Sequence, residues 1–263
     1  MNKNVILSNP PSILNRIFSV WFRHFRVYTK NLISNGLPAF IEPLFFLIAL
    51  GLGLGQYVSN INGKAYILFL ASGIMIPPSM FTASYECTFG TFIRLEFDKV
   101  YDGMLSSSIN YKDLLVGEIL FAGTKGLFFS SCILIVITLF GLVVSPIAIF
   151  APIVGFLTGL MFATLSLIIT SFVSNINHFS FYFSGFLTPM FFFSGIIFPL
   201  EKLPKNIVWI AEIFPLTHSA KIVRAFYFNN FNFNLIYDFI YTIGFILIMG
   251  FIAIKLMKRR LID

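Results

Sequence analysis

Residues 192–226 read FFSGIIFPLEKLPKNIVWIAEIFPLTHSAKIVRAF, a stretch that begins as an apolar membrane segment and then breaks up. Pro199, Pro204 and Pro215 each remove a backbone donor, so no helix of about 20 residues, the length that crosses a bilayer, can pass through them. The pieces between the prolines stay amphipathic. Broken helices at membrane depth are tolerated only where they pack against protein or line a polar cavity. The stretch therefore predicts a re-entrant helical hairpin, residues 200–233, that caps a pathway.

The composition indicates an all-α, polytopic membrane protein. Of the 263 residues, 57% are hydrophobic and 11% are charged, against roughly 45 to 50% and 25% in soluble domains. The formal net charge of +7 would suggest nucleic acid in a soluble protein, but here the basic residues gather beside apolar runs. That arrangement is typical of membrane topology, and we expect no nucleic-acid partner. Cys87 and Cys132 lie in or beside apolar runs, which predicts neither a disulfide framework nor a metal site.

Six membrane spans are predicted within a single domain, residues 1–263. Residues 12–34 carry apolar side chains at three- and four-residue spacing with arginines on other faces, which indicates an amphipathic interfacial helix in a cytoplasmic segment, residues 1–36. The apolar runs place spans at about 37–58, 65–87, 116–142, 147–173, 179–199 and 234–257. An even number of spans puts both termini on one side.

The basic residues assign the two sides. Twelve of the 18 Lys and Arg residues lie before the first span, between the second and third, or at the end of the last, and five lie across the membrane. Positively charged loops stay in the cytoplasm. Both termini are therefore predicted to be cytoplasmic, with the hairpin on the outer side.

Residues 88–115 form the longest predicted cytoplasmic connection between spans. Leu95, Tyr101 and Leu105 can share one apolar strip, while charged side chains occupy other faces. Such a helix beside a membrane suits docking to a cytoplasmic partner. A solvated loop that only joins two spans fits the spacing equally well. The candidate docking residues are Arg94, Glu96, Asp98, Lys99 and Asp102.

Ionisable residues at the spans form a predicted charge cluster. Glu42, Glu86 and Glu118 are expected at similar depth, and Lys125 follows Glu118 by seven residues, about 10 Å deeper on the same helix face. Its long stem could reach back to the carboxylates. The cluster could gate the cytoplasmic entrance or contact a polar headgroup, since intramembrane charges often mark pathways. A salt bridge without a substrate role is the favoured alternative, because water is available at that depth.

The hairpin carries its own polar groups. His218 could suggest a proton relay, but a single histidine without a second titratable partner is more often a packed or capping residue. Among the prolines, Pro199 and Pro215 flank the segment that changes direction. The candidate outer-hairpin residues are Pro199, Glu212, Pro215, His218 and Arg224.

Several sequence motifs of catalysis are missing. The chain has no Gly-x-x-x-x-Gly-Lys-Ser/Thr run, so it cannot hydrolyse ATP through a P-loop. It also has no His-x-x-x-His, Cys-x-x-Cys or nucleophile-elbow pattern. We expect neither catalytic residues, nor a metal site, nor a cofactor on this chain.

Two regions resemble the ABC-2 type permeases, in the branch that includes NodJ and the daunorubicin-resistance permeases. The hairpin matches in Phe193-Ser194-Gly195, Phe198-Pro199-Leu200, Phe214-Pro215-Leu216-Thr217-His218 and Val223-Arg224-Ala225. The cytoplasmic segment matches in Tyr85-Glu86, Phe89-Gly90-Thr91, Tyr101-Asp102-Gly103-Met104-Leu105 and Gly117-Glu118-Ile119-Leu120.

The resemblance implies a multi-pass protein of the bacterial inner membrane that exports an amphipathic substrate: a lipo-oligosaccharide, lipid, polysaccharide or drug. It implies a homodimer in contact with membrane lipid, with each copy docking a separate, NodI-like ATPase through the segment between spans two and three. ATP and Mg would bind to that ATPase.

Two other functions remain possible from the residues alone. An ion-gradient-driven secondary transporter would place ionisable residues at mid-membrane on broken spans, often within inverted repeats, and the sequence shows no repeat. A membrane-embedded enzyme would need a convergent nucleophile, base or metal set, which the sequence does not offer.

Overall fold

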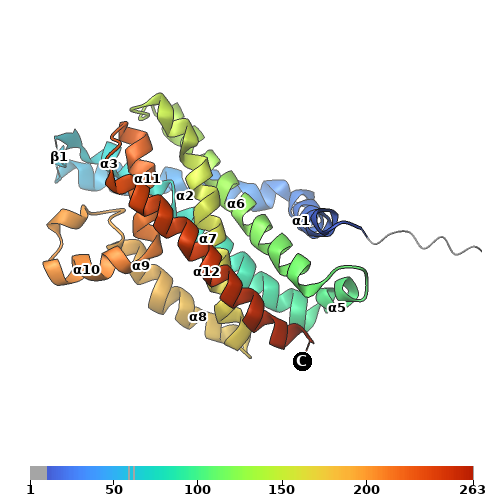
Figure 1. Ribbon diagram of the computed structural model, residues 1–263. Helices are drawn as coiled ribbons and strands as arrows, with labels where there is room; N and C mark the ends of the chain where they lie inside the picture. Colours follow the sequence, from blue (N-terminus) through green and yellow to red (C-terminus); the bar gives the residue numbers. More distant parts are fainter. Residues whose placement is uncertain (1–10, 59, 62, 263) are drawn as a thin grey trace, which may run out of the picture.

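The protein is a bundle of helices that run mostly in one direction (Figure 1). The computed structural model describes residues 11–58, 60, 61 and 63–262. The helices are α1 (Ile13–Lys30), α2 (Leu32–Phe46), α3 (Tyr66–Ile74), α4 (Pro77–Tyr85), α5 (Val100–Leu105), α6 (Tyr111–Leu139), α7 (Ala151–Phe172), α8 (Phe179–Tyr182), α9 (Thr188–Phe193), α10 (Lys205–Ile213), α11 (Pro215–Phe228) and α12 (Asn234–Ile262). Strands β1 (Asn60–Ile61) and β2 (Lys64–Ala65) pair antiparallel. Four π-helical turns (Leu47–Gly53, Glu86–Gly90, Ile93–Phe97 and Phe183–Leu187) and four 3₁₀ turns (Leu54–Gln56, Pro146–Phe150, Ile176–His178 and Leu200–Lys202) complete the helical elements.

Five helical runs in the described part of the chain are long and apolar enough to cross a membrane. They are Leu32–Gln56, Tyr66–Phe97, Tyr111–Leu139, Pro146–Phe172 and Asn234–Ile262. The chain is thus a polytopic helical membrane protein, as predicted.

The predicted fifth span, 179–199, is helical but short. It consists of α8, a π turn and α9, and its helix ends at Phe193, which leaves it below the length of about 20 residues that spans a bilayer. In Figure 1 this segment runs from the end of the bundle that holds α5 towards the end that holds α10.

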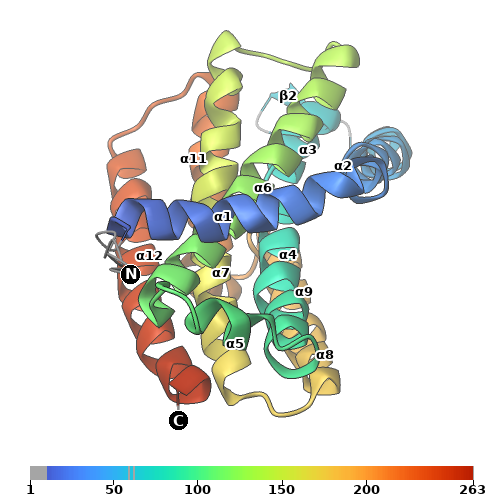
Figure 2. The same ribbon diagram turned by 90° about the vertical axis from the view of Figure 1, so that its right-hand side faces the viewer.

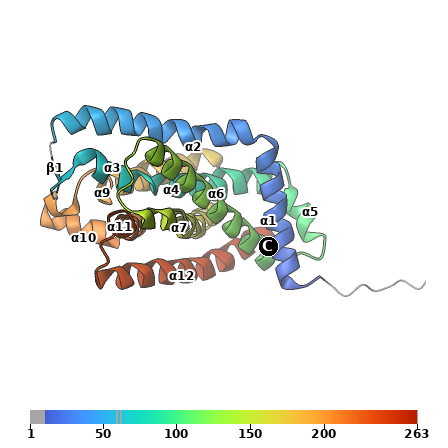
Figure 3. The same ribbon diagram turned by 90° about the horizontal axis from the view of Figure 1, so that it is seen from above.

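The two ends of the bundle carry different elements. The α5 end also holds α1 and the last turn of α12, whereas the α10 end holds β1 and β2 (Figures 1 and 3). The first and last described helices therefore meet at the same end.

Helix α1 lies across the bundle, roughly perpendicular to α6 and α7 (Figure 2). The Ser12 side chain accepts a hydrogen bond from the Asn15 amide at 3.3 Å, which caps the start of the helix. Asn31 interrupts the helical conformation, and α2 begins at Leu32. The first span therefore starts five residues before the predicted position.

The second span is broken once and then runs further than the sequence suggested. Pro77 and Pro78 cannot continue the helix from α3, so the chain turns at Met75 and Ile76 before α4 begins. Beyond α4 the two π turns carry the helical run to Phe97. The predicted cytoplasmic connection of residues 88–115 thus begins inside this run, in which Phe92 and Leu95 remain buried.

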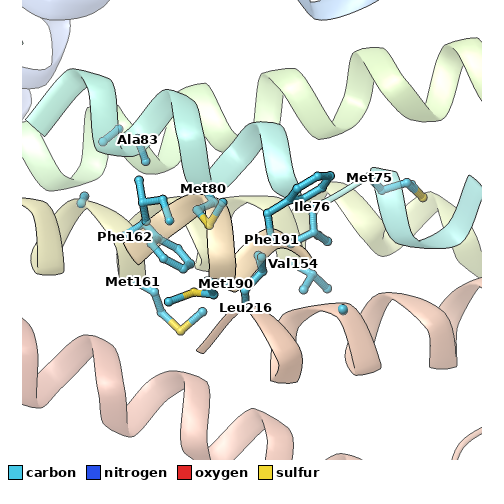
Figure 4. Close-up of a cluster of buried hydrophobic side chains, with 14 of the residues drawn as sticks. Met75, Ile76, Met80, Ala83, Val154, Met161, Phe162, Met190, Phe191 and Leu216 are labelled. Atoms are coloured by element: carbon cyan, nitrogen blue, oxygen red, sulfur yellow. The ribbon is translucent and has the colours of Figure 1, made fainter. Parts of the chain in front are cut away.

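The break in the second span lies in the bundle core. Figure 4 shows Met75 and Ile76 beside residues of α4, α7, α9 and α11. The labelled side chains are all buried: Met75, Ile76, Met80, Ala83, Val154, Met161, Phe162, Met190, Phe191 and Leu216. Apolar packing against four helices therefore surrounds the point where the chain turns.

The proline-broken segment forms separate short helices. Pro199 precedes the turn at Leu200–Lys202, Pro204 precedes α10, and Pro215 is the first residue of α11. Each proline therefore begins a helix, the position where its missing N–H is not needed. Helix α10 exposes Trp209, whereas α11 is largely buried against the bundle.

Gly195 ends the helix of α9. Its φ of +75° lies in the left-handed region, and a Cβ there would stand 2.7 Å from Cγ of Leu200. This glycine reverses the chain towards the hairpin.

We expect Gly195→Ala to lower the free energy of unfolding by about 1–3 kcal/mol, because alanine would be strained in both backbone and packing. The measurement is the thermal unfolding midpoint of the purified protein in detergent. Gly185→Ala is the matched control, because no heavy atom lies within 4 Å of its built Cβ. Equal midpoints for the two variants would contradict the assignment.

Candidate functional site

Four charged side chains form an ion network at the α5 end of the bundle. Arg94 donates from Nη1 to Oε1 of Glu86 at 2.6 Å and from Nη2 to Oε1 of Glu118 at 2.8 Å. Lys125 donates from Nζ to Oε2 of Glu86 at 2.9 Å. Two carboxylates and two cations balance, so the network carries no net charge.

The network brings two helices together. Glu86 and Arg94 belong to the second span and Glu118 and Lys125 to α6. In a regular α-helix, residues eight apart point about 80° away from each other. The π turns at Glu86–Gly90 and Ile93–Phe97 place an extra residue in each turn, which brings Glu86 and Arg94 towards one face. The sequence-predicted reach of Lys125 towards a carboxylate is confirmed.

Neutral groups complete the shell around Glu118. Tyr101, from α5, donates to Oε1 of Glu118 and accepts from Nε of Arg94 at 3.3 Å. Thr91 donates to Oε2 of Glu118 at 3.2 Å. Burial and the nearby Glu118 charge raise the pKa of Tyr101 well above its usual range, so its hydroxyl keeps the proton that it donates. Helix α5 is thereby attached to the network.

Helix α1 covers the network from outside. His24 places Nε2 3.8 Å from Oε1 of Glu118. Burial and the Arg94 charge lower the pKa of His24 to about 3, so its ring is neutral near pH 7 and the charge balance is kept.

Three further contacts hold α1 on α6. Arg16 donates from Nε to Oδ2 of Asp113 at 2.6 Å, and Trp21 donates to Oγ1 of Thr124 at 2.9 Å. Between these contacts, a Cβ built on Gly117 would lie 2.7 Å from Cβ of Val20. Only a glycine lets the two helices approach this closely.

The structure places Glu42 away from the network, which corrects the predicted four-residue cluster. Glu42 is exposed and lines a small apolar cavity of about 200 Å³ with Pro77 and Phe191. Glu86 lies nine residues beyond Pro77, about 13 Å further along a helix. Because α2 begins at Leu32, Glu42 lies near the middle of its helix and not at the depth of the other carboxylates.

The predicted docking residues divide into inward and outward groups. Arg94 belongs to the ion network. Glu96 accepts from Nη2 of Arg260 at 2.9 Å, which connects the end of the second span to the last turn of α12. The remaining three, Asp98, Lys99 and Asp102, are exposed.

In the hairpin, His218 has the titratable partner that the sequence did not reveal. Its Nδ1 lies 2.7 Å from Oδ1 of Asp238, and its Nε2 lies 2.9 Å from the carbonyl oxygen of Glu212. The ring stacks on Tyr241 with centroids 3.8 Å apart. These contacts join α11 to the start of α12. The expectation that His218 has no titratable partner is therefore wrong.

Four partners were missed from the sequence: His24, Tyr101, Asp238 and Arg260. The sequence predicts Tyr101 in an apolar strip; its ring is buried, but its hydroxyl reaches Glu118. The other three lie far along the chain from the groups that they meet. The available signal was limited to a polar residue at the edge of an apolar run. Among the described residues, no group of three or more His, Cys, Asp or Glu side chains is placed to hold a metal ion.

Comparison with known proteins gives consistent matches. The chain matches the family described as "ABC-2 type transporter" over residues 15–228. It is 33% identical to nodulation protein J of Sinorhizobium fredii over 206 residues, 78% of this chain and 79% of the relative. It is 30% identical to nodulation protein J of Rhizobium leguminosarum bv. trifolii over 100% of both chains. The inner membrane transport permease YadH of Escherichia coli is 20% identical over 92% of this chain and 94% of its own length.

We expect Arg94→Gln to destabilise the protein by about 3–5 kcal/mol, because it leaves two carboxylates with one cation in a buried site. The double variant Arg94→Gln/Glu118→Gln removes one charge of each sign and should recover part of this loss. Thermal unfolding in detergent measures both, with Lys99→Gln as an exposed control. A double variant less stable than Arg94→Gln would show that charge balance is not what Arg94 supplies.

Proposed function

Because the chain belongs to the ABC-2 type transporter family, we propose that it is an exporter's membrane subunit that moves an amphipathic substrate out of the cytoplasm, powered by a separate ATPase. The observation that carries the proposal is the ion network of Glu86, Arg94, Glu118 and Lys125. It joins the second span to α6, and the hydroxyl of Tyr101 attaches α5 to it.

The exposed side chains of the cytoplasmic segment form the proposed docking surface. Asp98, Lys99 and Asp102 present charges of both signs to solvent at the α5 end. Charged groups on a short helix can pair with a moving partner surface while the apolar side stays packed. The partner is a NodI-like ATPase, which would bind ATP and Mg.

A displacement of α5 would be passed on through buried contacts. Tyr101 holds α5 on Glu118 and Arg94, and Glu96 holds the adjacent turn on Arg260. Buried ion pairs and hydrogen bonds of this kind hold the groups that they join in fixed positions. ATP-driven closure of two ATPases would therefore move the second span, α6 and α12 together.

The exposed carboxylate of Glu42 supports a pathway between two copies of the chain. A charged side chain facing lipid near mid-membrane costs about 3 kcal/mol or more. Glu42 lies on α2, which is on the opposite side of the bundle from α12 (Figure 3). A second copy placed against α2 would remove this carboxylate from lipid and form a polar path.

The remaining assignments follow from the same arrangement. The α5 end faces the cytoplasm with both termini, six passes cross the inner membrane, and α10 with α11 forms a re-entrant cap on the outer side. Helix α1 exposes Leu14 and Phe18, which suit the lipid interface. The proposed substrate is amphipathic: a lipo-oligosaccharide, lipid, polysaccharide or drug. Transport by this chain alone in vesicles with an ion gradient and no ATP would instead support a secondary transporter.

We expect Asp102→Lys to reduce substrate-stimulated ATPase activity of the co-expressed complex about tenfold or more, because it reverses a charge on the docking surface. Membrane insertion should be unchanged. The assay compares ATP hydrolysis and co-purification of the ATPase in both complexes. Lys205→Glu, an exposed charge reversal at the α10 end, is the control. Normal coupling in Asp102→Lys would exclude this docking role, and a chain that never binds an ATPase would exclude the function.

The proposed pathway predicts which surface joins two copies. We expect Phe45→Cys on α2 to crosslink between chains in membranes, and Ile243→Cys on α12 not to do so. Both positions are exposed in one chain, and the native Cys87 and Cys132 are buried. The measurement is the dimer fraction after a short bismaleimide reagent. Crosslinking only through position 243 would place the interface on α12 and contradict the proposal.

A further inference from the structure

A second polar site lies at the α10 end of the bundle. It is a cavity of about 760 Å³ enclosed by β2, α3, α11, the start of α12 and the loop before α10. The side chains that matter here are Lys64, Phe69, Glu201, Lys221, Arg224 and Phe228.

Half of the six charged side chains that line this cavity are already paired. Lys221 donates to both carboxylate oxygens of Glu212, at 2.7 and 2.5 Å. Asp238 is held by His218. Three charged side chains of the lining have no partner within ion-pair distance among the described residues, namely the cations Lys64 and Arg224 and the carboxylate Glu201.

Arg224 is only partly satisfied. Its Nη2 donates to the carbonyl oxygen of Ile196 at 3.1 Å and its Nε to Oγ of Ser72 at 3.4 Å. Its guanidinium carbon lies 3.9 Å from the ring centroid of Phe69. No carboxylate of the described residues lies within the 4.0 Å that defines an ion pair. A guanidinium has five N–H donors, so these neutral contacts fix its position and leave donors for a ligand.

Lys64 supplies the second free cation. Its Nζ lies 3.5 Å from the ring centroid of Phe228, and its side chain is exposed to solvent. Strand β2 therefore brings an ammonium to the same cavity that Arg224 enters from α11. Two aromatic rings orient the two cations without neutralising them.

We propose that this cavity binds the phosphate group of a phosphate ester, with Arg224 and Lys64 as the groups that hold it. A tetrahedral phosphate can accept from a planar guanidinium and from an ammonium at once. The carbonyl of Ile196 and the hydroxyl of Ser72 use only some of the donors of Arg224. The negative charge of Glu201, in the same cavity, lowers the affinity for phosphate. The inference concerns binding and does not depend on the transport cycle.

The rest of the cavity suits the remainder of such a molecule. A volume of about 760 Å³ lies in the range of sites that hold organic ligands. Phe69, Phe228 and Leu235 provide apolar wall, and Asn230 and Asn232 provide amides that can bind hydroxyl groups. An ester-linked headgroup therefore fits better than a bare ion, although both share the phosphate.

The test uses the full chain in a non-ionic detergent and isothermal titration calorimetry at constant ionic strength. The probes are inorganic phosphate, dihexanoylphosphatidylglycerol below its micellar concentration, and uncharged dihexanoylglycerol. Arg224→Gln should weaken phosphate-group binding about tenfold or more. Lys64→Gln should weaken it about threefold, and Glu201→Gln should strengthen it about threefold. Lys205→Gln, an exposed lysine outside the cavity, is the control.

Lys64 and Glu201 are both exposed, so their variants keep the test decisive if Arg224→Gln does not fold. If inorganic phosphate binds and the phospholipid does not, the ligand is a free oxyanion. If the phospholipid binds more tightly, the ligand is a phosphate-ester headgroup. Both outcomes support the site. No saturable binding of either phosphate probe, equal binding of the uncharged lipid, or equal affinities of Lys64→Gln, Glu201→Gln and Lys205→Gln would overturn it.

Discussion

Arg94 shares one guanidinium between Glu86 and Glu118, and the α5 end of the bundle is organised around that shared charge. Charges removed from water at this depth must be paired, because an isolated one costs several kcal/mol. The need to pair these charges holds the second span against α6 and brings the Tyr101 hydroxyl of α5 to Glu118. It also favours the neutral form of His24, because a third cation would upset the charge balance. Helix α1 can lie across the bundle because Gly117 admits Val20 beside these groups.

Buried charges are paired at one end of the molecule and only partly paired at the other. At the α5 end, two cations and two carboxylates balance and are surrounded by hydrogen bonds from Tyr101 and Thr91. Such a site is rigid and suited to passing on displacement. At the α10 end, Arg224 rests on carbonyl, hydroxyl and aromatic groups, with no carboxylate partner among residues 11–262 as described. Unsatisfied donors in a cavity are suited to a ligand that comes and goes.

Part of the candidate site could be predicted from the sequence. Helix geometry places Glu118 and Lys125, seven residues apart, on one face, and the lysine stem is long enough to reach back towards a carboxylate. Glu42 could not be placed, because apolar patterning fixes the start of a span only to within several residues, and five residues are more than one turn. The sequence predicts a surface position for Arg94, because the π turns that direct it inward have no recognised sequence signal.

The sequence alone determined that the chain is helical and crosses a membrane several times, because long apolar runs have no other stable structure in lipid. It also determined where the chain breaks, since proline cannot continue a helix at positions 199, 204 and 215. Tertiary structure decided which charges meet. Asp238 joins His218, and Arg260 joins Glu96, across 20 and 164 residues. Such pairs depend on how helices pack, because each helix considered alone offers several polar side chains that could be the partner.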